Sequence, residues 1–575
     1  MRAKDINGRN NRSPLLEAVL FGGAGDFGMN MMVLKSRNCS LMLDAGSALP
    51  GLIHFGIQAV IPNIETLSKE VGTLDGIVLT HGHQDHIGAV PFIWHILRGN
   101  IYGTSFTLAL LERILKEHAI APEERLVEVS IGSHIKIGVF DLEFINVAHS
   151  LPGSVAVAVN TPAGTVLHTG DYKMNASQQE ASATDRSRLA EIGKEGVLAM
   201  FADSTNALMS GYTPDEQHAY RGLERLFSTI DTRIFVTTFS SSINRVRTLF
   251  ELARTHGRKV FLMGRSLINN VRLAERLGYL EIAPNLYAEK SKLRQYLRKE
   301  LLVIATGSQG EPRSALHQLA TVPDGRVPLE SGDVIAFSAR LIPGNEGQLN
   351  QLVKRLVKRD IEVVQNAEHP IHVSGHGSQQ DMKEMLSLVK PDYIVPIHGD
   401  HAQLLRHAAL GDAHADCSST AIAVQNGVRL CFDSNEAWFG YPIEASLNYI
   451  DHDRQICTRN EALLAERRAI AQSGLLIVTI GSRVTHETPR RYFQVTTHGL
   501  RMATEESDLT KQVEARIETI ITDMASTKCD GTVGMETEIR KQLRSLFRSQ
   551  NRVCPVVLTV FTERLCALKQ YLPAA

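Results

Sequence analysis

The chain has 575 residues, 43% of them apolar, and its 61 Lys and Arg residues nearly balance its 62 Asp and Glu residues. This length exceeds what one hydrophobic core supports, so we expect two to four domains, and the composition excludes an intrinsically disordered chain. The balanced charge neither indicates nor excludes a nucleic-acid partner that binds a local basic channel.

Targeting signals and disulfides are not expected. The N-terminal apolar run is broken by Glu17 and is too short for a signal peptide, and no apolar stretch approaches membrane-spanning length. We therefore expect a cytoplasmic protein with no membrane partner. The seven cysteines contain no C-x-x-C pair, which favours buried reduced thiols over a disulfide framework or a zinc ribbon.

The first half of the chain is rich in strands. Short apolar runs, punctuated by Gly and Asp, predict strands over 18–23, 31–36, 40–46 and 76–80. Helical periodicity then predicts a helix over 106–119, while alternation predicts a strand over 141–150 and a hairpin over 154–172. The run at 76–80 leads into a polar cluster and then a helical pattern, a position that active sites favour.

From about Thr213 strands and helices alternate. Strands over 233–239 and 259–264, separated by a helix over 243–256, indicate βαβ units and a parallel sheet. Strand-like segments return over 371–377 and 393–400, each carrying histidine near its end. The predicted organisation is a flexible N-terminus (1–13), a first core part (14–212), an α/β domain (213–361), a second core part (362–447), a linker (448–460) and a small α+β domain (461–575).

The segment His81-Gly-His83-Gln-Asp85-His86 carries three imidazoles and a carboxylate immediately after an apolar strand. A solvated polar turn does not need so many potential ligands, and the mixture of histidine and carboxylate favours zinc or a similar divalent ion. We interpret this segment as a metal site. His149, Asp171 and His398 lie at similar strand ends, although each alone would usually be a capping or core residue.

Three further segments have two readings each. Asp44, at a strand end, either orients a metal ligand or is a plain turn aspartate. Residues His372, Val373, Ser374, Gly375 and His376 either grip phosphate oxygens, with His376 also protonating the leaving 3′ oxygen, or form a tight turn. Ser240, Ser241 and Ser242, before a predicted helix, either bind a phosphate or only cap that helix.

These motifs, taken in order, resemble the metallo-β-lactamase fold, an αββα sandwich, and the match extends to its β-CASP nuclease branch, in which Asp203, His376 and His398 correspond to motifs A, B and C. The segments GDFGMNMMVL, THGHQDHIGA, HTGDYK, DSTNA, ATGSQGEP and IHVSGHGSQ further resemble the ribonuclease J family. Two positions depart from that family's pattern: Gln84 stands where Glu is usual, and Gly153 where Asp is usual.

The resemblance implies an α/β protein with a metallo-β-lactamase sandwich, an inserted β-CASP domain and a small α+β C-terminal domain. It implies one metal held by His81, His83, His149 and Asp171, and a second held by Asp85, His86, Asp171 and His398. Two zinc ions are expected, with Mn2+ or Mg2+ as alternatives, because paired divalent ions stabilise both the attacking and the leaving oxygen of a phosphodiester. Asp85, His376 and Asp44 are the expected catalytic residues.

The function that we predict is hydrolysis of RNA in RNA processing and decay, as a 5′-to-3′ exonuclease with additional endonuclease activity, by a homo-oligomer (dimer or tetramer). Two alternatives remain at this point. One is a different enzyme with the same metals, either a β-CASP nuclease that acts on DNA, since no motif distinguishes a 2′-hydroxyl from its absence, or a hydrolase of small esters. The other is a non-catalytic partner subunit that binds RNA.

Overall fold

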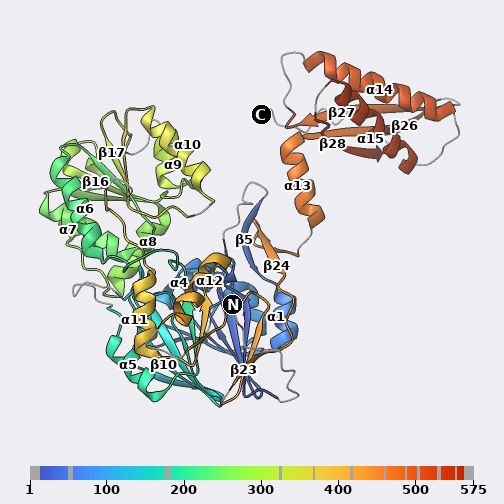
Figure 1. Ribbon diagram of the computed structural model, residues 1–575. Helices are drawn as coiled ribbons and strands as arrows, with labels where there is room; N and C mark the ends of the chain where they lie inside the picture. The colour runs from blue at the N-terminus through green and yellow to red at the C-terminus, as the bar shows by residue number, and fades with distance from the viewer. Residues whose placement is uncertain are drawn as a thin grey trace. The chain divides into compact units, whose positions relative to one another are not determined.

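The computed structural model describes residues 13–562, apart from 49–55, 123, 175–182, 323–326, 343, 367–368, 415–418, 435, 459–460, 486–487, 501–505, 527–531 and 551–552. It contains two compact units, the first made mostly of residues up to 456 and the second mostly of residues from 457 onward (Figure 1). Of the expected N-terminal segment 1–13, only Ser13 lies within the described residues. No described helix is long and apolar enough to cross a membrane.

The first unit contains two large sheets. The eight-stranded sheet has the order β23-β22-β1-β3-β4-β6-β7-β8. Its strands are β1 (Leu16–Gly22), β3 (Met31–Ser36), β4 (Cys39–Leu43), β6 (Leu74–Val78), β7 (Leu97–Gly103), β8 (Leu126–Glu128), β22 (Arg429–Phe432) and β23 (Ala437–Phe439). The seven-stranded sheet has the order β21-β19-β13-β12-β11-β10-β9. Its strands are β9 (His134–Ile137), β10 (Phe140–Asn146), β11 (Val155–Thr161), β12 (Gly164–His168), β13 (Ala199–Asp203), β19 (Tyr393–Ile397) and β21 (Thr420–Ala421).

Alternation along the strands builds the layers, because successive side chains point to opposite faces of a sheet. In β1, Leu16, Ala18 and Leu20 pack into the core between the sheets, whereas Val19 and Phe21 pack on the outer face. Helices α1 (Ile64–Val71) and α4 (Ser105–Glu117) contribute to the outer core of the first sheet. Helices α5 (Arg186–Glu195) and α11 (Gln379–Val389) cover the second sheet. This is the predicted αββα sandwich.

A five-stranded parallel sheet, ordered β15-β16-β14-β17-β18, follows in the chain. Its strands are β14 (Ile234–Thr237), β15 (Lys259–Met263), β16 (Leu301–Ala305), β17 (Val334–Phe337) and β18 (Glu362–Gln365). Its helices are α6 (Glu216–Thr229), α7 (Ile243–Thr255), α8 (Arg265–Arg276), α9 (Ala315–Thr321) and α10 (Glu346–Val357). The later strands β19, β21, β22 and β23 rejoin the two sandwich sheets, so the parallel domain is an insertion, as predicted. The predicted boundary at 361 is too early, because β18 pairs with β17 in the parallel sheet.

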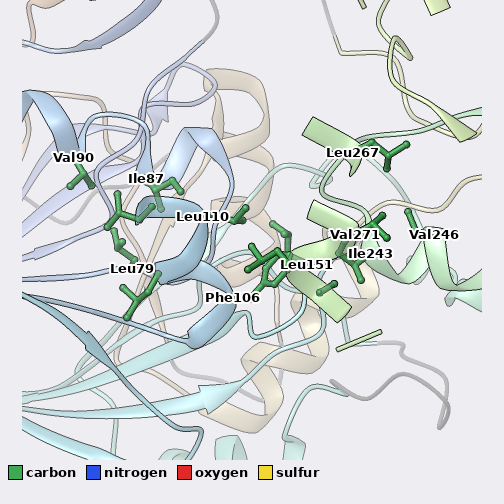
Figure 2. Close-up of a cluster of buried hydrophobic side chains, with 14 of the residues drawn as sticks. Leu79, Ile87, Val90, Phe106, Leu110, Leu151, Ile243, Val246, Leu267 and Val271 are labelled. Carbon is green, nitrogen blue, oxygen red and sulfur yellow. The ribbon is translucent and has the colours of Figure 1, made fainter. Parts of the chain in front are cut away.

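One apolar core connects the insertion with the sandwich (Figure 2). Phe106 and Leu110 of α4 and Leu151 of the sandwich pack in the same cluster as residues of α7 and α8. The residues from these two helices include Ile243, Val246, Leu267 and Val271. Because protein cores are close-packed, this cluster limits relative movement of the two domains where they meet.

The second unit is an α+β fold, as predicted. It contains α13 (Glu461–Ser473), β26 (Leu475–Thr485), β27 (Thr488–His498), α14 (Glu506–Ser526), α15 (Thr532–Ser549) and β28 (Val556–Thr562). Apolar faces of its two long helices are buried in one core, to which Val513, Ile517, Ile539 and Leu543 contribute. The expected linker over 448–460 includes most of β24 (Leu447–Asp451) and all of β25 (Ile456–Thr458).

The strand predicted over 371–377 is wrong, because this segment is irregular in the structure. Its backbone carbonyl groups accept hydrogen bonds from side chains instead of from a neighbouring strand. Arg245 donates to the Ile371 carbonyl at 2.7 Å, and Asn206 and Thr213 donate to the His376 carbonyl at 2.8 and 2.7 Å. Such side-chain partners satisfy the backbone without a ladder.

Candidate metal centre

The histidine-rich turn follows β6 directly, at the edge of the eight-stranded sheet. His83 precedes the short helix α2 (Gln84–Ile87), which turns Asp85 and His86 back toward the sheet edge. His81 and His86 are buried, at 0% and 1% exposure, whereas Asp85 is partly exposed. Burying imidazoles beside a carboxylate at a strand end is costly unless they are paired or hold an ion.

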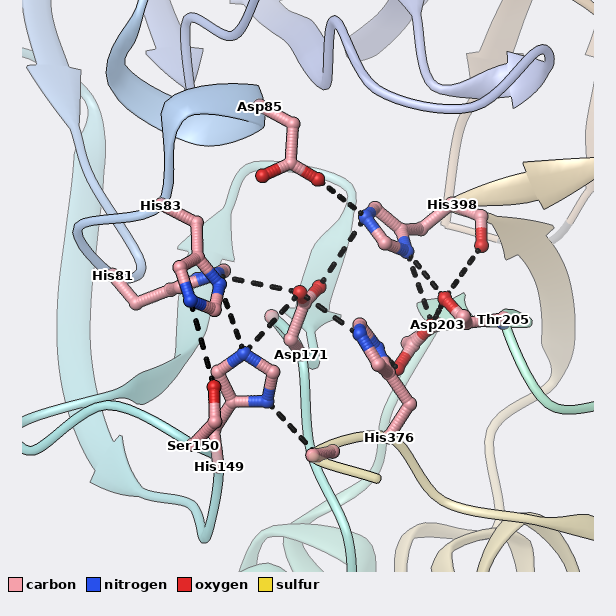
Figure 3. A network of polar contacts seen from close by, with 12 residues as sticks. His81, His83, Asp85, His149, Ser150, Asp171, Asp203, Thr205, His376 and His398 are labelled. Carbon is pink, nitrogen blue, oxygen red and sulfur yellow. Dashed lines mark hydrogen bonds and ion pairs between the residues drawn. The ribbon is translucent and has the colours of Figure 1, made fainter. Parts of the chain in front are cut away.

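Asp171, in the turn after β12, lies at the centre of the cluster (Figure 3). Its Oδ2 atom is 3.4 Å from Nε2 of both His81 and His86, and 3.7 Å from Nε2 of His149. The same oxygen is buried and has no hydrogen-bond partner. A carboxylate oxygen that faces three ring nitrogens just beyond hydrogen-bond distance leaves a space suited to a cation.

His81, His83, His149 and Asp171 form a first donor group whose ligand atoms all lie within 4.8 Å of one another. Nδ1 of His83 is 3.0 Å from Nε2 of His81 and 3.1 Å from Nε2 of His149. Zn–N bonds of about 2.0–2.1 Å in a tetrahedron imply N–N separations of roughly 3.3 Å. The donors present therefore fit zinc in type and in spacing.

Asp85, His86 and His398 form a second donor group on the other side of Asp171. Nε2 of His398 is 3.2 Å from Oδ2 of Asp85 and 3.8 Å from Oδ1 of Asp171. Oδ2 of Asp171 thus faces His86 of this group as well as the first group, and Oδ1 faces His398, so Asp171 lies between the two donor groups. A third overlapping group contains Asp171, Asp203, His376 and His398.

Burial and charge divide the imidazoles into two kinds. Burial lowers the pKa of His83 to about 4 and that of His149 to about 3, so these rings are neutral, the form that binds metals. Burial also lowers the pKa of His86, but the carboxylates of Asp171, Asp44 and Asp85 outweigh it and raise the value to about 10. The carboxylates around His86 thus favour a positive charge at this place, which a metal ion would supply.

Neighbouring carboxylates fix the orientation of two rings. Oδ2 of Asp44 is 2.7 Å from Nδ1 of His86, and Thr80 donates to both Asp44 oxygens at 2.8 Å. Oδ1 of Asp203 is 3.2 Å from Nδ1 of His398. In both cases Nδ1 carries the contact and Nε2 faces the donor group, which is how carboxylates orient metal-binding histidines.

Asp44 and His168 both lie beside the donor groups, and their contacts differ. Asp44 has a positive φ of 57°, which is uncommon for a non-glycine residue, and its contact with His86 exceeds what a turn aspartate requires. His168 does not enter any donor group; its Nδ1 accepts a hydrogen bond from the Gly170 amide at 3.1 Å. His168 therefore supports the turn that carries Asp171.

The segment 372–376 is only partly brought to the cluster. The ring of His376 stacks on that of His398 at 5.3 Å between centroids, and its Nδ1 is 2.9 Å from Oδ2 of Asp203. The Gly375 carbonyl is 2.9 Å from Nδ1 of His149. His372 belongs to no donor group; burial and the charges of Arg245, Arg340 and Lys173 hold its pKa well below the usual range. Val373 is buried and Ser374 is partly buried.

The serine run, Ser240 to Ser242, contacts the cluster through Ser241. Oγ of Ser241 is 3.3 Å from Nε2 of His83. Ser242 precedes α7, but its side chain makes no capping hydrogen bond, and the Ser240 carbonyl accepts from Nδ2 of Asn270 at 2.9 Å. Ser241 thus contacts Nε2 of His83, whereas Nδ1 of the same ring faces His81 and His149.

Sequence reasoning did not single out several residues that hold this site together. Oγ1 of Thr205 is 2.6 Å from Nδ1 of His398, and Nδ2 of Asn206 donates to Oγ of Ser374 at 3.0 Å. Both belong to the DSTNA segment, so position next to Asp203 was the available signal. Asn270 and Arg113 lie on ordinary helices and had no sequence signal.

The two departures from the family pattern lie beside the cluster. Gln84 donates to Oγ of Ser47 at 3.1 Å and is exposed. Gly153 has a positive φ of 72°, and its carbonyl accepts from Thr104 at 2.7 Å. Neither residue belongs to a donor group.

An αββα sandwich with a buried histidine and aspartate centre defines a metallohydrolase of the metallo-β-lactamase fold. Family models agree with this class. The metallo-beta-lactamase superfamily matches residues 24–206, the ribonuclease J beta-CASP domain 231–356, the Zn-dependent metallo-hydrolase RNA specificity domain 348–418, and the ribonuclease J C-terminal domain 462–564.

Whole-chain similarity identifies the family. The chain is 32% identical to ribonuclease J of Synechocystis, covering 96% of this chain and 87% of that protein. It is 34% identical to ribonuclease J of Thermus thermophilus, covering 81% and 82%. The chain therefore belongs to the ribonuclease J family of metal-dependent ribonucleases. A crystal structure of an Enterococcus faecalis protein of unknown function shares the fold, with a TM-score of 0.52 at 16% identity over 72% of this chain and 100% of that one.

Proposed function

We propose that the chain hydrolyses RNA as a 5′-to-3′ exonuclease with additional endonuclease activity, using two zinc ions, with Mn2+ or Mg2+ as alternatives. The observation that carries this proposal is Asp171, whose buried Oδ2 has no hydrogen-bond partner and faces three imidazoles between two donor groups. One carboxylate between two such groups is suited to bridge a pair of ions.

In this proposal the chain holds the ions with two sets of ligands. His81, His83, His149 and Asp171 hold the first, and Asp85, His86, Asp171 and His398 hold the second. Bound divalent ions would polarise the phosphate and supply a nucleophile from water at neutral pH. Asp44 holds the His86 ring through Nδ1 and keeps Nε2 directed at the second group.

His376 is the proposed proton donor to the departing 3′ oxygen. Its Nδ1 contacts Asp203 at 2.9 Å, which leaves Nε2 for the substrate. Burial lowers the pKa of His376, but the charges of Asp203 and Asp171 outweigh burial and raise it. A protonated imidazole oriented by a carboxylate is suited to general acid catalysis.

The proposed substrate contacts are Ser240, Ser241 and Ser242 on one side, and the segment from His372 to His376 on the other. Ser241 lies against His83 and Gly375 against His149, so both segments adjoin the first donor group. We propose that they hold the 5′-terminal phosphate one nucleotide from the scissile bond. The exonuclease should then act faster on 5′-monophosphorylated than on 5′-triphosphorylated RNA.

Product analysis tests direction and metal dependence together. With 5′-labelled RNA, we expect release of labelled mononucleotide, its loss after chelation and its recovery on adding Zn2+, Mn2+ or Mg2+. Labelled products that shorten gradually from the 3′ end would refute the 5′-to-3′ direction. Equal rates on RNA with 5′-monophosphate and 5′-triphosphate would refute the phosphate contacts but not the metal centre.

Variants of the second donor group test the two-ion mechanism. Replacing Asp85 and His86 with Ala should abolish turnover while RNA binding persists, because the serine run remains intact. His95→Ala is the matched control, since His95 is an exposed histidine a few residues further along the same segment. Turnover in the double variant equal to that of the control would contradict two-ion catalysis.

Two alternatives are tested in the same assays. The rates of hydrolysis of an RNA strand and of a DNA strand with the same sequence, measured separately, distinguish a ribonuclease from a nuclease that acts on DNA. A non-catalytic subunit is disfavoured because both donor groups are present in the described residues. We also propose a dimer or tetramer, supported by the family resemblance, and expect light scattering to give a mass of two or four chains.

A further inference from the structure

A chain of polar contacts connects the sandwich with the serine run. Arg113 of α4 donates from Nη1 to Oδ1 of Asn270 on α8 at 2.7 Å, and Nδ2 of Asn270 donates to the Ser240 carbonyl at 2.9 Å. Asn270 is 2% exposed. These three residues come from three separate parts of the chain, and the buried amide lies between the other two.

The chemistry of the partners fixes the orientation of the Asn270 amide. A guanidinium can only donate and a carbonyl can only accept, so the amide oxygen must face Arg113 and the amide nitrogen must face Ser240. Neither an aspartate nor a leucine can make both contacts. A buried amide with both ends satisfied stabilises one geometry, whereas a half-satisfied one is costly.

The same helix α4 also packs under the metal centre. A Cβ atom added to Gly82, between His81 and His83, would lie 2.5 Å from Cδ1 of Leu110. Leu110 belongs to the apolar cluster that runs from the sandwich to α7 and α8 (Figure 2). Helix α4 thus contacts the His81–His83 turn directly and the Ser240 backbone through Asn270.

The contact between Ser241 and His83, at 3.3 Å, completes this arrangement. Helix α4 therefore supports the first donor group directly, through Leu110, and the serine run through Asn270, which sets the distance between the two. In an exonuclease that measures one nucleotide from a 5′ phosphate, this distance determines which phosphodiester lies at the metals, since misplacement by about 1 Å costs roughly 100-fold in rate.

We propose that Asn270, supported by Arg113, is a positioning residue that sets the distance between the serine run and the metal centre and thereby the preference for the RNA 5′ end. This inference rests on the proposed 5′-to-3′ exonuclease function. Helix α8 of the insertion, through Asn270, and helix α4 of the sandwich, through Arg113, then both contribute to selection of the RNA 5′ end.

Asn270→Asp is the decisive variant. It keeps an oxygen for Arg113, removes the donor to Ser240 and places a carboxylate against a carbonyl. Asn269→Asp is the matched control, because Asn269 precedes it on the same helix and is exposed. Both variants are compared with the wild-type chain for thermal unfolding and bound metal before kinetics.

The kinetic readout is the rate on 5′-monophosphorylated RNA divided by the rate on 5′-hydroxyl RNA, measured beside hydrolysis of bis(p-nitrophenyl) phosphate, which has no 5′ end. We expect Asn270→Asp to lower the RNA ratio roughly 10-fold or more, with a much smaller change on the small diester. Asn269→Asp should match the wild type. An unchanged ratio, or equal losses on both substrates, would overturn the positioning role.

Amide hydrogen exchange of residues 239–243 gives a second readout that does not depend on exonuclease activity. Exchange should increase in Asn270→Asp and stay unchanged in Asn269→Asp, and equal exchange in both would overturn the proposal. If the wild type hydrolyses RNA without any 5′-end preference, the proposed exonuclease mode fails and selection of the 5′ end by Asn270 fails with it. Exchange then decides only whether Asn270 holds the serine run.

Discussion

Asp381 offers a sharp test of how the site is held together. This residue, in the first turn of α11, is fully buried at 0% exposure. Its Oδ1 accepts from the Met174 amide at 2.7 Å, and its Oδ2 accepts from the amides of Thr213 and Ser378 at 2.8 and 2.9 Å. One carboxylate thus joins the loops that follow Asp171, Asp203 and His376.

The cost of Asp381→Asn follows from these contacts. The amide oxygen can still accept from Thr213 and Ser378, but the amide nitrogen then faces the Met174 N–H, so one charge-assisted bond becomes an opposition of two donors. Hydrogen bonds to charged groups contribute about 1.5–3 kcal/mol each, so we expect a loss of about 3 kcal/mol. For a unit of roughly 450 residues, with an unfolding entropy of about 2.1 cal/mol/K per residue, this lowers the unfolding temperature by about 3 °C.

Scanning calorimetry together with amide exchange at Met174, Thr213 and Ser378 measures this effect. Glu384→Gln is the control, since Glu384 lies one turn further along α11 and makes a partly exposed ion pair with Arg186 at 2.6 Å. Such pairs contribute about 0–1 kcal/mol. If Asp381→Asn and Glu384→Gln unfold at the same temperature with the same exchange at the three amides, Asp381 does not join these loops.

Three further predictions follow from single contacts. Gly375→Ala places a Cβ 2.7 Å from Nδ1 of His149 and should displace that ring. The amount of bound metal, measured by mass spectrometry, and kcat should therefore both fall. Gly347→Ala is the control, because its new Cβ meets no atom within 4 Å, and it should keep both values. Gly153→Asp should destabilise by about 1–2 kcal/mol in urea unfolding, because φ is +72° and the new Cβ lies 2.7 Å from Thr104; unchanged stability would show that the family's usual aspartate fits here. His407 is buried, and burial lowers its pKa to about 4. The folded pKa of His407 is below the unfolded value of about 6.5, so its neutral form stabilises the fold above pH 6.5, and this contribution, on the order of 3 kcal/mol, is lost as pH falls toward 4. In His407→Asn, the free energy of unfolding should therefore change less between pH 6.5 and 4. A pH profile identical to that of the wild type would contradict this role of His407.

The sequence predicted the fold where periodicity and local chemistry agree. The hairpin over 154–172 forms because β11 and β12 alternate around a tight turn, and their pairing is antiparallel as expected. The segment 371–377 has the same apolar alternation at its start, yet forms no strand. Its carbonyls are taken by Arg245, Asn206 and Thr213, three side chains distant in sequence, and local periodicity contains no information about such partners.

The donor residues were accessible from the sequence for a similar reason. His81 to His86 are close neighbours, so their density alone indicates a metal, whereas His149, Asp171 and His398 needed the order of motifs in a known family. The residues that position them were not accessible. Asn206, Asn270 and Asp381 are single polar residues on a loop and two helices. Asn206 and Asp381 gain the partners cited here only when the chain that follows the insertion rejoins the sandwich, and Asn270 gains its partners only when the insertion packs against the sandwich.

The serine run shows how the structure separates two readings that the sequence leaves equal. A serine that only caps α7 would accept a hydrogen bond from the first turn of the helix, and Ser242 makes no such bond. Ser241 instead directs its hydroxyl at Nε2 of His83, whose Nδ1 faces the other imidazoles of the first donor group. The helix is stable without this cap because its buried face, including Ile243 and Val246, lies in the shared apolar cluster. Capping therefore does not account for Ser242, and the contact of Ser241 with His83 is the observation that supports the proposed substrate contact.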